Sequence, residues 1–240
     1  MTHMHIPDGI LPVGLWIAGF LLMFLAMGIS LHRLRNSDQK KKIPLLGAIS
    51  AAMLVAMSLE IIPIAYHINL SVVAGILLGP ALGFLAAFIT NLMLALMGHG
   101  GITVMGLNTL LLGTEVIVGH TLFYALHRRL PVFWRAAAAT MLTLFLTTLA
   151  LVGIVAASNV DPGLFRDAGE HVVVERGAHH EDLISVSRFA SIALSLGFFG
   201  WFIEAAITGS VISFIARVKP DLLSHVLHRE KTAQEGRQTR

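Results

Sequence analysis

Residues 68–97 read INLSVVAGILLGPALGFLAAFITNLMLALM, and this apolar stretch decides the fold. A helix that crosses the hydrocarbon core of a bilayer needs about 20 apolar residues, so the stretch is too long for one ordinary crossing. Gly79-Pro80 interrupts it near the middle. Proline lacks a backbone donor and disfavours helix at the residue before it. We therefore predict a break at Gly79-Pro80, and two crossings if the chain turns there.

Five further apolar runs surround this stretch, and each is long enough to cross a bilayer. They cover residues 11–31, 44–66, 102–126, 136–157 and 187–216. Of the 240 residues, 55% are hydrophobic and 13% are charged, which is about half the charged fraction of an average soluble domain. This composition excludes a soluble enzyme. The absence of cysteine excludes disulfides, thiolate catalysis and cysteine-ligated metals.

Lysine and arginine are concentrated in three clusters, at residues 33–42, 128–135 and 217–240. Such clusters mark the cytoplasmic side of a membrane protein. All three fall on one side only if residues 68–97 cross the membrane twice. We therefore predict an all-α membrane protein with seven transmembrane helices, an external amino terminus and a cytoplasmic carboxyl terminus. The net charge of +3 then reflects orientation in the lipid bilayer, and nucleic acid is not expected as a partner.

The sequence divides into three parts on this topology. Residues 1–10 form an external metal-binding tail, residues 11–217 the seven-span membrane domain, and residues 218–240 a cytoplasmic tail. Pro220-Asp221 is typical of a helix start, and the apolar positions after it predict a short amphipathic helix on the cytoplasmic surface. The membrane domain includes an external acidic loop at residues 158–187. No Walker loop is present, so ATP hydrolysis is expected on separate proteins.

Small residues recur at four-residue spacing, which lets transmembrane helices approach closely. The rows are Ala48, Ala52 and Ala56 in the second apolar run, and Ala205 and Gly209 in the last. We interpret both rows as packing within this chain, with docking of another membrane subunit as the alternative.

Seven of the twelve histidines fall on the external side of this topology. They are His3, His5, His67, His99, His171, His179 and His180. His99 occupies a glycine-flanked turn, which we expect at the outer mouth of the bundle together with His67 and the tail. Neutral imidazole is a common ligand of nickel, cobalt, copper and zinc. The pattern predicts a divalent-metal site at this mouth.

The amino terminus can itself chelate a metal. With a free amine on Met1, the sequence Met1-Thr2-His3 offers an amine, two amides and an imidazole in one plane. Square-planar nitrogen coordination suits nickel(II) and copper(II).

Three acidic residues, Glu60, Glu115 and Glu204, lie in or near the predicted spans. Intramembrane carboxylates are costly and by default indicate a site or an ion path. Glu60 stands about two helical turns before His67, where it either draws cations to the mouth or is an ordinary interfacial acid. For the deeper Glu115 and Glu204, we favour packing pairs over a part in transport. Their candidate partners are Asn91, Asn108 and His120.

Three motifs in the first half of the chain resemble one family. Residues 4–11 read MHIPDGIL, Tyr66-His67 precedes ILLGP at residues 76–80, and residues 100–108 read GGITVMGLN. In this order they resemble the cobalt/nickel substrate-capture membrane subunit of energy-coupling-factor transporters, the CbiM/NikM family. The resemblance is specific through about residue 125 and weaker beyond it.

The resemblance implies a seven-span importer subunit in the cell (inner or plasma) membrane. It implies that nitrogen atoms of Met4, His5 and His67 bind the metal and that Asn108 holds the tail in place. The implied substrate is Co²⁺ or Ni²⁺, for cobalamin synthesis or for nickel enzymes, with no catalytic cofactor. The implied partners are a transmembrane coupling subunit, cytoplasmic ATPase subunits and a small membrane accessory subunit.

Three residues precede the matched Met4, which departs from the family pattern. Either translation begins at Met4, or the tail is trimmed, or Met1-Thr2-His3 supplies the chelate with His5 nearby. We favour the last. The candidate metal site therefore comprises Met1, Thr2, His3, Met4, His5 and His67, with Asn108, Glu60 and His99 in support.

Two other functions compete with metal capture. An intramembrane metal-dependent enzyme needs an open metal position with an acid or base beside it, and no HExxH pair is present. A membrane scaffold with incidental histidines is the second alternative. We expect a transport subunit and not an enzyme.

Overall fold

A computed structural model of the chain describes residues 12–35, 42–61, 66–126, 130–158 and 186–223. In these ranges the chain forms seven α-helices, one short 3-10 helix and one pair of two-residue strands. The elements are α1 (Val13–Arg35), α2 (Ile43–Ser58), β1 (Glu60–Ile61), β2 (Tyr66–His67), α3 (Ser71–Leu78), α4 (Pro80–Leu96), α5 (Met105–Ala125), α6 (Val132–Ser158), α8 (Val186–Val218) and η2 (Pro220–Leu223). The predicted helical class is confirmed for this part of the chain, which contains seven α-helices where seven transmembrane helices were expected.

The predicted break at Gly79-Pro80 is confirmed. α3 ends at Leu78 and α4 begins at Pro80, a position where the missing proline donor costs the helix nothing. Gly79 between them has a φ of 82°, a left-handed conformation that glycine adopts without strain. α3 has only eight residues, or about 12 Å of helix, so it does not cross a bilayer by itself. All eight residues are buried, and α3 therefore lies inside the bundle.

The second apolar run does not continue as a helix to residue 66, as we expected. α2 ends at Ser58, and the chain then forms the antiparallel β1–β2 pair, in which Glu60 lies opposite His67. Pro63 in the intervening sequence explains the difference, because a helix continued through it would lose a backbone hydrogen bond and bring the proline ring against the preceding turn. Glu60 and His67 are thus neighbours across a hairpin and not residues two turns apart on one helix.

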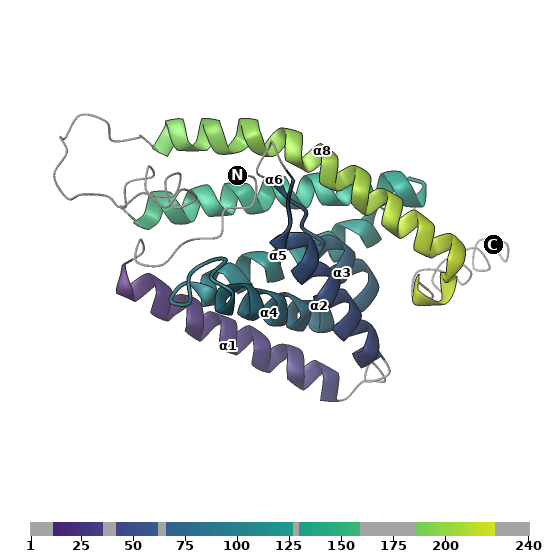
Figure 1. The fold of residues 1–240 in the computed structure, drawn as a ribbon, viewed down its shortest axis with the longest axis horizontal. Helices are drawn as coiled ribbons and strands as arrows, with labels where there is room; N and C mark the ends of the chain where they lie inside the picture. Colours follow the sequence, from purple (N-terminus) through teal and green to yellow (C-terminus); the bar gives the residue numbers. More distant parts are fainter. Residues whose placement is uncertain (1–11, 36–41, 62–65, 127–129, 159–185, 224–240) are drawn as a thin grey trace, which may run out of the picture.

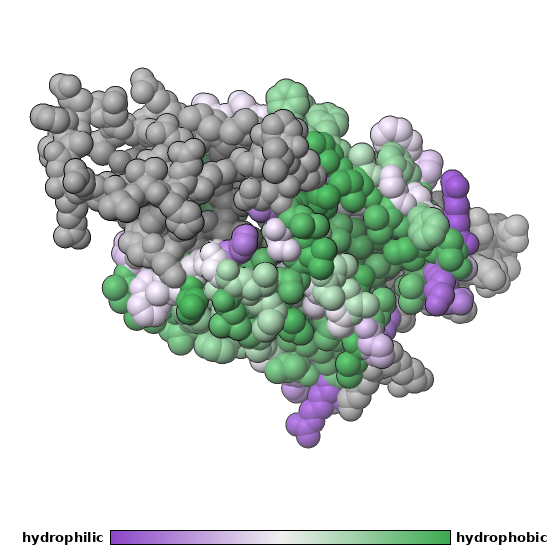
Figure 2. Space-filling model, viewed as in Figure 1, coloured by the Kyte–Doolittle hydropathy of each residue, from purple (hydrophilic) through white to green (hydrophobic). Residues whose placement is uncertain are grey.

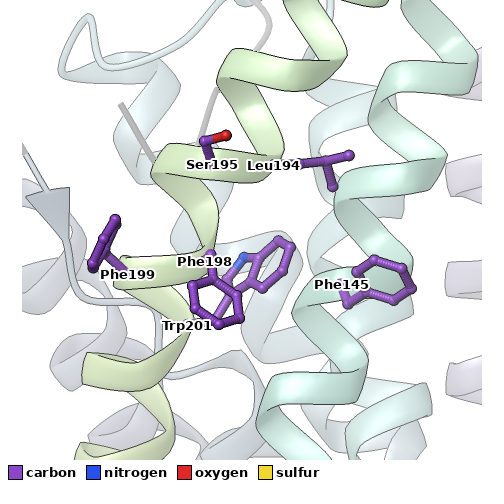
Figure 3. A pocket seen from close by; sticks show the side chains of 6 residues that line it. All are labelled: Phe145, Leu194, Ser195, Phe198, Phe199 and Trp201. Carbon is purple, nitrogen blue, oxygen red and sulfur yellow. The ribbon is translucent and has the colours of Figure 1, made fainter.

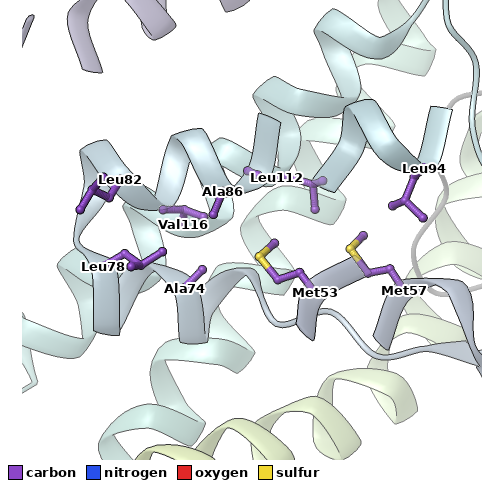
Figure 4. Close-up of a cluster of buried hydrophobic side chains, with 10 residues drawn as sticks. Met53, Met57, Ala74, Leu78, Leu82, Ala86, Leu94, Leu112 and Val116 are labelled. Carbon is purple, nitrogen blue, oxygen red and sulfur yellow. The ribbon is translucent and has the colours of Figure 1, made fainter. Parts of the chain in front are cut away.

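α5 is the central helix of the bundle. It packs against α1, α3, α4 and α6, while α2 packs mainly against α4. α6 and α8 form the most extensive helix pair and run side by side along one edge of the molecule (Figure 1). An apolar core joins α2, α3, α4 and α5 (Figure 4). It is built from Met53, Met57, Ala74, Leu78, Leu82, Ala86, Ala87, Leu94, Leu112 and Val116.

Apolar side chains also cover the outside of the bundle. Most of the coloured surface in Figure 2 is hydrophobic, with hydrophilic residues mainly at its lower and right-hand margins. Leu21 of α1 and Phe199 of α8 are 67% and 71% exposed. Soluble monomers rarely expose apolar surface of this extent, whereas a bilayer covers it. Among the described residues, three helices are long and apolar enough to cross a membrane: Val13–Arg35, Val132–Ile154 and Gly197–Val218.

The two rows of small residues have different surroundings. In α8, Ala205 is buried, and a Cβ atom added to Gly209 would meet the ring of Phe133 on α6, so this row packs within the chain as expected. In α2, Ala48 and Ala52 are exposed, and a Cβ atom added to the nearby Gly47 would meet no atom within 4 Å. The expectation of packing within the chain is wrong for α2, because its buried face is formed by Ser50, Met53 and Met57 instead.

The carboxyl-terminal segment begins as predicted but packs differently. η2 starts at Pro220. Leu223 is 4% exposed and joins a core cluster with Val72 of α3 and Phe123 of α5. Leu223 is therefore anchored in the bundle, while Pro220 and Asp221 of the same turn are exposed. Residues 224–240 and most of the acidic loop, residues 159–185, lie outside the described residues.

Candidate metal site and its buried polar support

Most of the predicted metal ligands lie outside the described residues. They are Met1, Thr2, His3, Met4 and His5, and His171, His179 and His180, which were predicted to be external, lie outside them too. Within the described ranges, no group of three or more histidine, aspartate or glutamate residues is placed to hold a metal ion. A complete site at His67 therefore needs ligands from the remaining parts of the chain.

His67 lies in β2, one strand of the hairpin between α2 and α3. It is half-buried, and its Nδ1 atom is shielded from solvent. Its backbone pairs with that of Glu60, so the structure brings these two predicted residues together at the level of the backbone. The strand pair fixes the chain on the amino-terminal side of the imidazole.

His99 and Asn108, the other two predicted supporting residues, have opposite environments. His99 is exposed in the turn after α4, where its backbone N–H donates to the Leu94 carbonyl at 2.9 Å. The flanking Gly98 and Gly100 have φ angles of 81° and 98°, which confirms the predicted tight turn. Asn108 lies in the first turns of α5 and is 3% exposed. A buried amide of this kind can hold a neighbouring segment, whereas an exposed turn histidine is free to rotate.

The motif at residues 100–108 is anchored to two helices. The side-chain amide of Asn91 on α4 donates to the Met105 carbonyl at 3.0 Å and to the Thr109 hydroxyl at 2.8 Å. On the other side, a Cβ atom added to Gly106 would lie 2.6 Å from the backbone nitrogen of Phe20 on α1. Glycine at this position therefore permits the close approach of α1 to α5.

Glu115 on α5 is the centre of a buried polar cluster. Its carboxylate is 5% exposed, and it accepts hydrogen bonds from the Asn69 side-chain amide, the Ser71 hydroxyl at 2.6 Å and the Thr147 hydroxyl at 3.2 Å. These donors come from the segment after β2, from the first residue of α3 and from α6. A buried carboxylate is tolerated when hydrogen bonds replace its lost hydration.

Asn69 links this cluster to the second buried carboxylate. Its backbone N–H donates to Oε1 of Glu204 on α8 at 3.1 Å, and its side-chain oxygen accepts from the Ser71 N–H at 2.8 Å. Glu204 is 1% exposed. The segment from His67 to Ser71 is thereby connected to α5, α6 and α8.

Sequence reasoning identified the right kind of partner for these acids, but two of the three candidates, Asn91 and His120, have other partners. Asn91 bonds to Met105 and Thr109, and His120 bonds through Nδ1 to the Gly75 carbonyl at 2.9 Å. Asn69 and Ser71 could have been noticed as polar residues directly after His67, but nothing in the sequence indicates that they reach Glu115.

A second polar contact lies at the opposite end of α3. The Lys42 ammonium donates to the Leu77 carbonyl at 3.2 Å, and His120 contacts the Gly75 carbonyl one half-turn earlier. Burial lowers the pKa of Lys42 from its ordinary value. A positive group at a helix carboxyl terminus interacts favourably with the helix dipole, so Lys42 stabilises the end of this short helix.

The α6–α8 pair also contains a pocket that has the wrong chemistry for a cation. Its lining residues are Phe145, Leu194, Ser195, Phe198, Phe199 and Trp201 (Figure 3). The rings of Phe145 and Trp201 meet edge to face, with centroids 5.8 Å apart. The lining provides one hydroxyl and no carboxylate or imidazole, so we exclude this pocket as the metal site.

A helical bundle with an apolar exterior, a helix break at Gly79-Pro80 and buried, hydrogen-bonded carboxylates has the features of an integral membrane protein. The chain shares its fold with a solved structure described as a transition metal transporter. The TM-score is 0.72, with coverage of 90% of this chain and 93% of that chain at 21% identity.

Within that class, residues 5–222 match the family model described as the cobalt uptake substrate-specific transmembrane region, CbiM, and the chain belongs to this family. The resemblance in its three motifs is confirmed. The fused protein NikMN of Archaeoglobus fulgidus, named for nickel transport, is 29% identical over 92% of this chain and 68% of its own length. The cobalt transport protein CbiM of Clostridium tetani is 28% identical over 62% of this chain and 66% of its own length.

Proposed function

We propose that this chain is the substrate-binding membrane subunit of an ATP-driven energy-coupling-factor importer that captures Co²⁺ or Ni²⁺. The observation that carries the proposal is the placement of His67 in a chain of the cobalt-uptake family. The histidine belongs to the strand pair and lies two residues before Asn69, which buried hydrogen bonds fix to α5 and α8. An imidazole ordered before the metal arrives suits capture, because binding then costs less conformational entropy.

We infer that nitrogen atoms of the amino-terminal tail complete the site. Because Nδ1 of His67 is buried, Nε2 is the ring nitrogen that we assign to the metal. Met1-Thr2-His3 would supply the amine, amides and imidazole of a planar chelate, with Met4 and His5 taking that role if the chain begins at Met4. The proposed supporting residues at the outer mouth of the bundle are Asn108, Glu60 and His99. Relatives named for nickel and for cobalt support either ion as substrate.

The orientation that we propose has the amino-terminal tail outside and the carboxyl terminus in the cytoplasm. The three basic clusters support it, since they mark a cytoplasmic side. The membrane is then the cell (inner or plasma) membrane, with residues 1–10 as capture tail, 11–217 as membrane domain and 218–240 as cytoplasmic tail.

The proposed partners are a transmembrane coupling subunit, cytoplasmic ATPases and a small membrane accessory subunit. The sequence has no nucleotide-binding loop, which supports separate ATPases. The exposed row of Gly47, Ala48 and Ala52 on α2 supports docking of a membrane helix, because small residues let two helix backbones approach closely.

Uptake of radioactive Ni²⁺ and Co²⁺ into cells tests the proposal. The chain is expressed in a host deleted for its own importers, alone and together with the coupling and ATPase genes. We expect energy-dependent accumulation only in the second case. We also expect this accumulation to be lost when the amine of the amino-terminal tail is blocked and His3, His5 and His67 are replaced. Accumulation by the chain alone, or uptake unchanged by the tail and His67 substitutions, would contradict the proposal.

A further inference from the structure

The segment that leaves the hairpin at His67 is fixed by a polar cluster buried between α3, α5, α6 and α8. We propose that Asn69 and Glu115 are positioning residues that set the location of the His67 imidazole in the metal site. This inference rests on the proposed role of His67 as a ligand, and it adds a function for two buried residues that do not touch the metal.

Asn69 is fixed by hydrogen bonds of three of its polar groups. Its side-chain amide donates to Oε2 of Glu115, its side-chain oxygen accepts from the Ser71 N–H at 2.8 Å, and its backbone N–H donates to Glu204 at 3.1 Å. The residue is 2% exposed, so water does not compete for these bonds. Such an anchor has one position and one orientation relative to α5 and α8.

The anchor lies two residues from His67, so the two cannot move independently. Two residues of extended chain span at most about 7 Å. On its other side, His67 is fixed by backbone pairing with Glu60. The backbone of His67 is therefore held by its pairing with Glu60 on one side and by Asn69 on the other, so a shift of Asn69 moves this backbone directly.

Glu115 provides the fixed end of the anchor because it is shared between elements. Oε2 accepts from both Asn69 and the Ser71 hydroxyl at 2.6 Å, while Oε1 accepts from the Thr147 hydroxyl of α6 at 3.2 Å. Removing the carboxylate leaves three buried donors without this acceptor, and the local chain would rearrange to satisfy them. Metal ligands are commonly oriented by such outer contacts.

The experiment measures Ni²⁺ binding to the purified full chain by calorimetry, and the donor set of the bound ion by its visible absorption band. The variants are Asn69→Ala, Glu115→Leu, Glu115→Gln, His67→Ala and the double variant His67→Ala with Asn69→Ala. Thermal unfolding is recorded for each. We expect Asn69→Ala and Glu115→Leu to weaken binding about 10–100-fold, the effect usual for outer contacts of a metal ligand, and to move the band toward that of His67→Ala.

Glu115→Gln tests whether hydrogen bonding is the cause. The amide oxygen of glutamine can accept from Asn69 and Ser71, and its NH2 group can donate to the Thr147 hydroxyl. We therefore expect near wild-type affinity and absorption for Glu115→Gln. If Glu115→Gln binds as weakly as Glu115→Leu, the negative charge and not the positioning matters, and the inference is overturned.

The double variant separates positioning from a general loss of structure. A residue that acts through His67 has no further effect once His67 is gone, so the double variant should match His67→Ala in affinity. Additive losses in the double variant, or an unchanged absorption band in Asn69→Ala, would overturn the inference while leaving the proposed function intact. Unchanged affinity in His67→Ala would instead remove the proposed ligand, which is a different and distinguishable failure.

Discussion

Gly75 of α3 and Val116 of α5 are so close that a Cβ atom added to Gly75 would lie 2.3 Å from the Val116 carbonyl oxygen. Lipid offers helices no hydrophobic gain on association, so close backbone contact has to supply the packing energy. The same glycine accepts the His120 contact through its carbonyl at 2.9 Å. The short helix α3 thus makes close backbone contact with α5 on the side where the Asn69–Glu115 cluster lies.

We expect Gly75→Ala to destabilise the protein, because the new methyl group cannot be accommodated without moving one helix. The cost should be about 1–3 kcal/mol, the usual range for overpacking. Gly47→Ala on α2 is the matched control, since its added Cβ meets nothing within 4 Å. It should be neutral or slightly stabilising, as alanine favours helix over glycine by up to about 1 kcal/mol. Unfolding in detergent measures both, and equal stabilities would contradict the packing described.

Asn91→Leu should also lower stability, for a different reason. The substitution removes the two hydrogen bonds that the Asn91 amide donates. The buried Met105 carbonyl and Thr109 hydroxyl then each lose this partner. The expected cost is about 1–3 kcal/mol. Thr114→Ala on α5 removes only an exposed hydroxyl that bonds within its own helix, so it should change stability by less than about 0.5 kcal/mol. The same unfolding assay compares them, and a harmless Asn91→Leu would show that this contact carries no stability.

Local sequence rules predicted the parts of this fold that depend on neighbouring residues. The break at Gly79-Pro80 follows from the chemistry of proline, and the turn at His99 follows from its flanking glycines. The end of α2 was missed because apolar composition outweighed Pro63 in our interpretation, although the proline was visible. The resulting hairpin places Glu60 opposite His67, a relationship that helical spacing does not contain.

The candidate site was predictable only in part, since its support is made by long-range contacts. Asn69 meets residues 46 and 135 positions away in the sequence, namely Glu115 and Glu204. Polar residues inside apolar runs indicate that such partners exist, but the pairing depends on how the helices pack. Spacing likewise did not show that Ala48 and Ala52 face outward, because both faces of α2 carry small or apolar residues.

A bulky residue on the exposed face of α2 should disturb assembly and not metal binding. We expect Ala48→Leu to reduce co-purification with the coupling subunit several-fold and to lower uptake in cells, because the leucine keeps a docking helix at a distance. Metal affinity and unfolding of the isolated chain should stay unchanged. Ala18→Leu, on the exposed face of α1, is the control and should assemble normally. If both variants assemble like the parent chain, α2 is not the docking face.

The proposed orientation can be tested by cysteine labelling, because the natural chain contains no cysteine to interfere. We expect Ala178→Cys, in the acidic loop, to react with a membrane-impermeant thiol reagent in intact cells. Ala233→Cys, in the basic tail, should react only after the cells are opened. The reverse pattern would invert the topology, and external labelling at both positions would contradict a membrane crossing by α8.

The central claim is that His67 binds the captured metal, and calorimetric titration of the purified chain with Ni²⁺ and Co²⁺ tests it most directly. We predict that one metal ion binds per chain. His67→Ala should lower the affinity at least about 10-fold, because loss of an outer contact of a metal site already costs about that much. His32→Ala serves as the comparison, because that histidine is exposed in the last turn of α1, and it should retain most of the affinity. Equal affinities of the parent chain and His67→Ala would contradict the account.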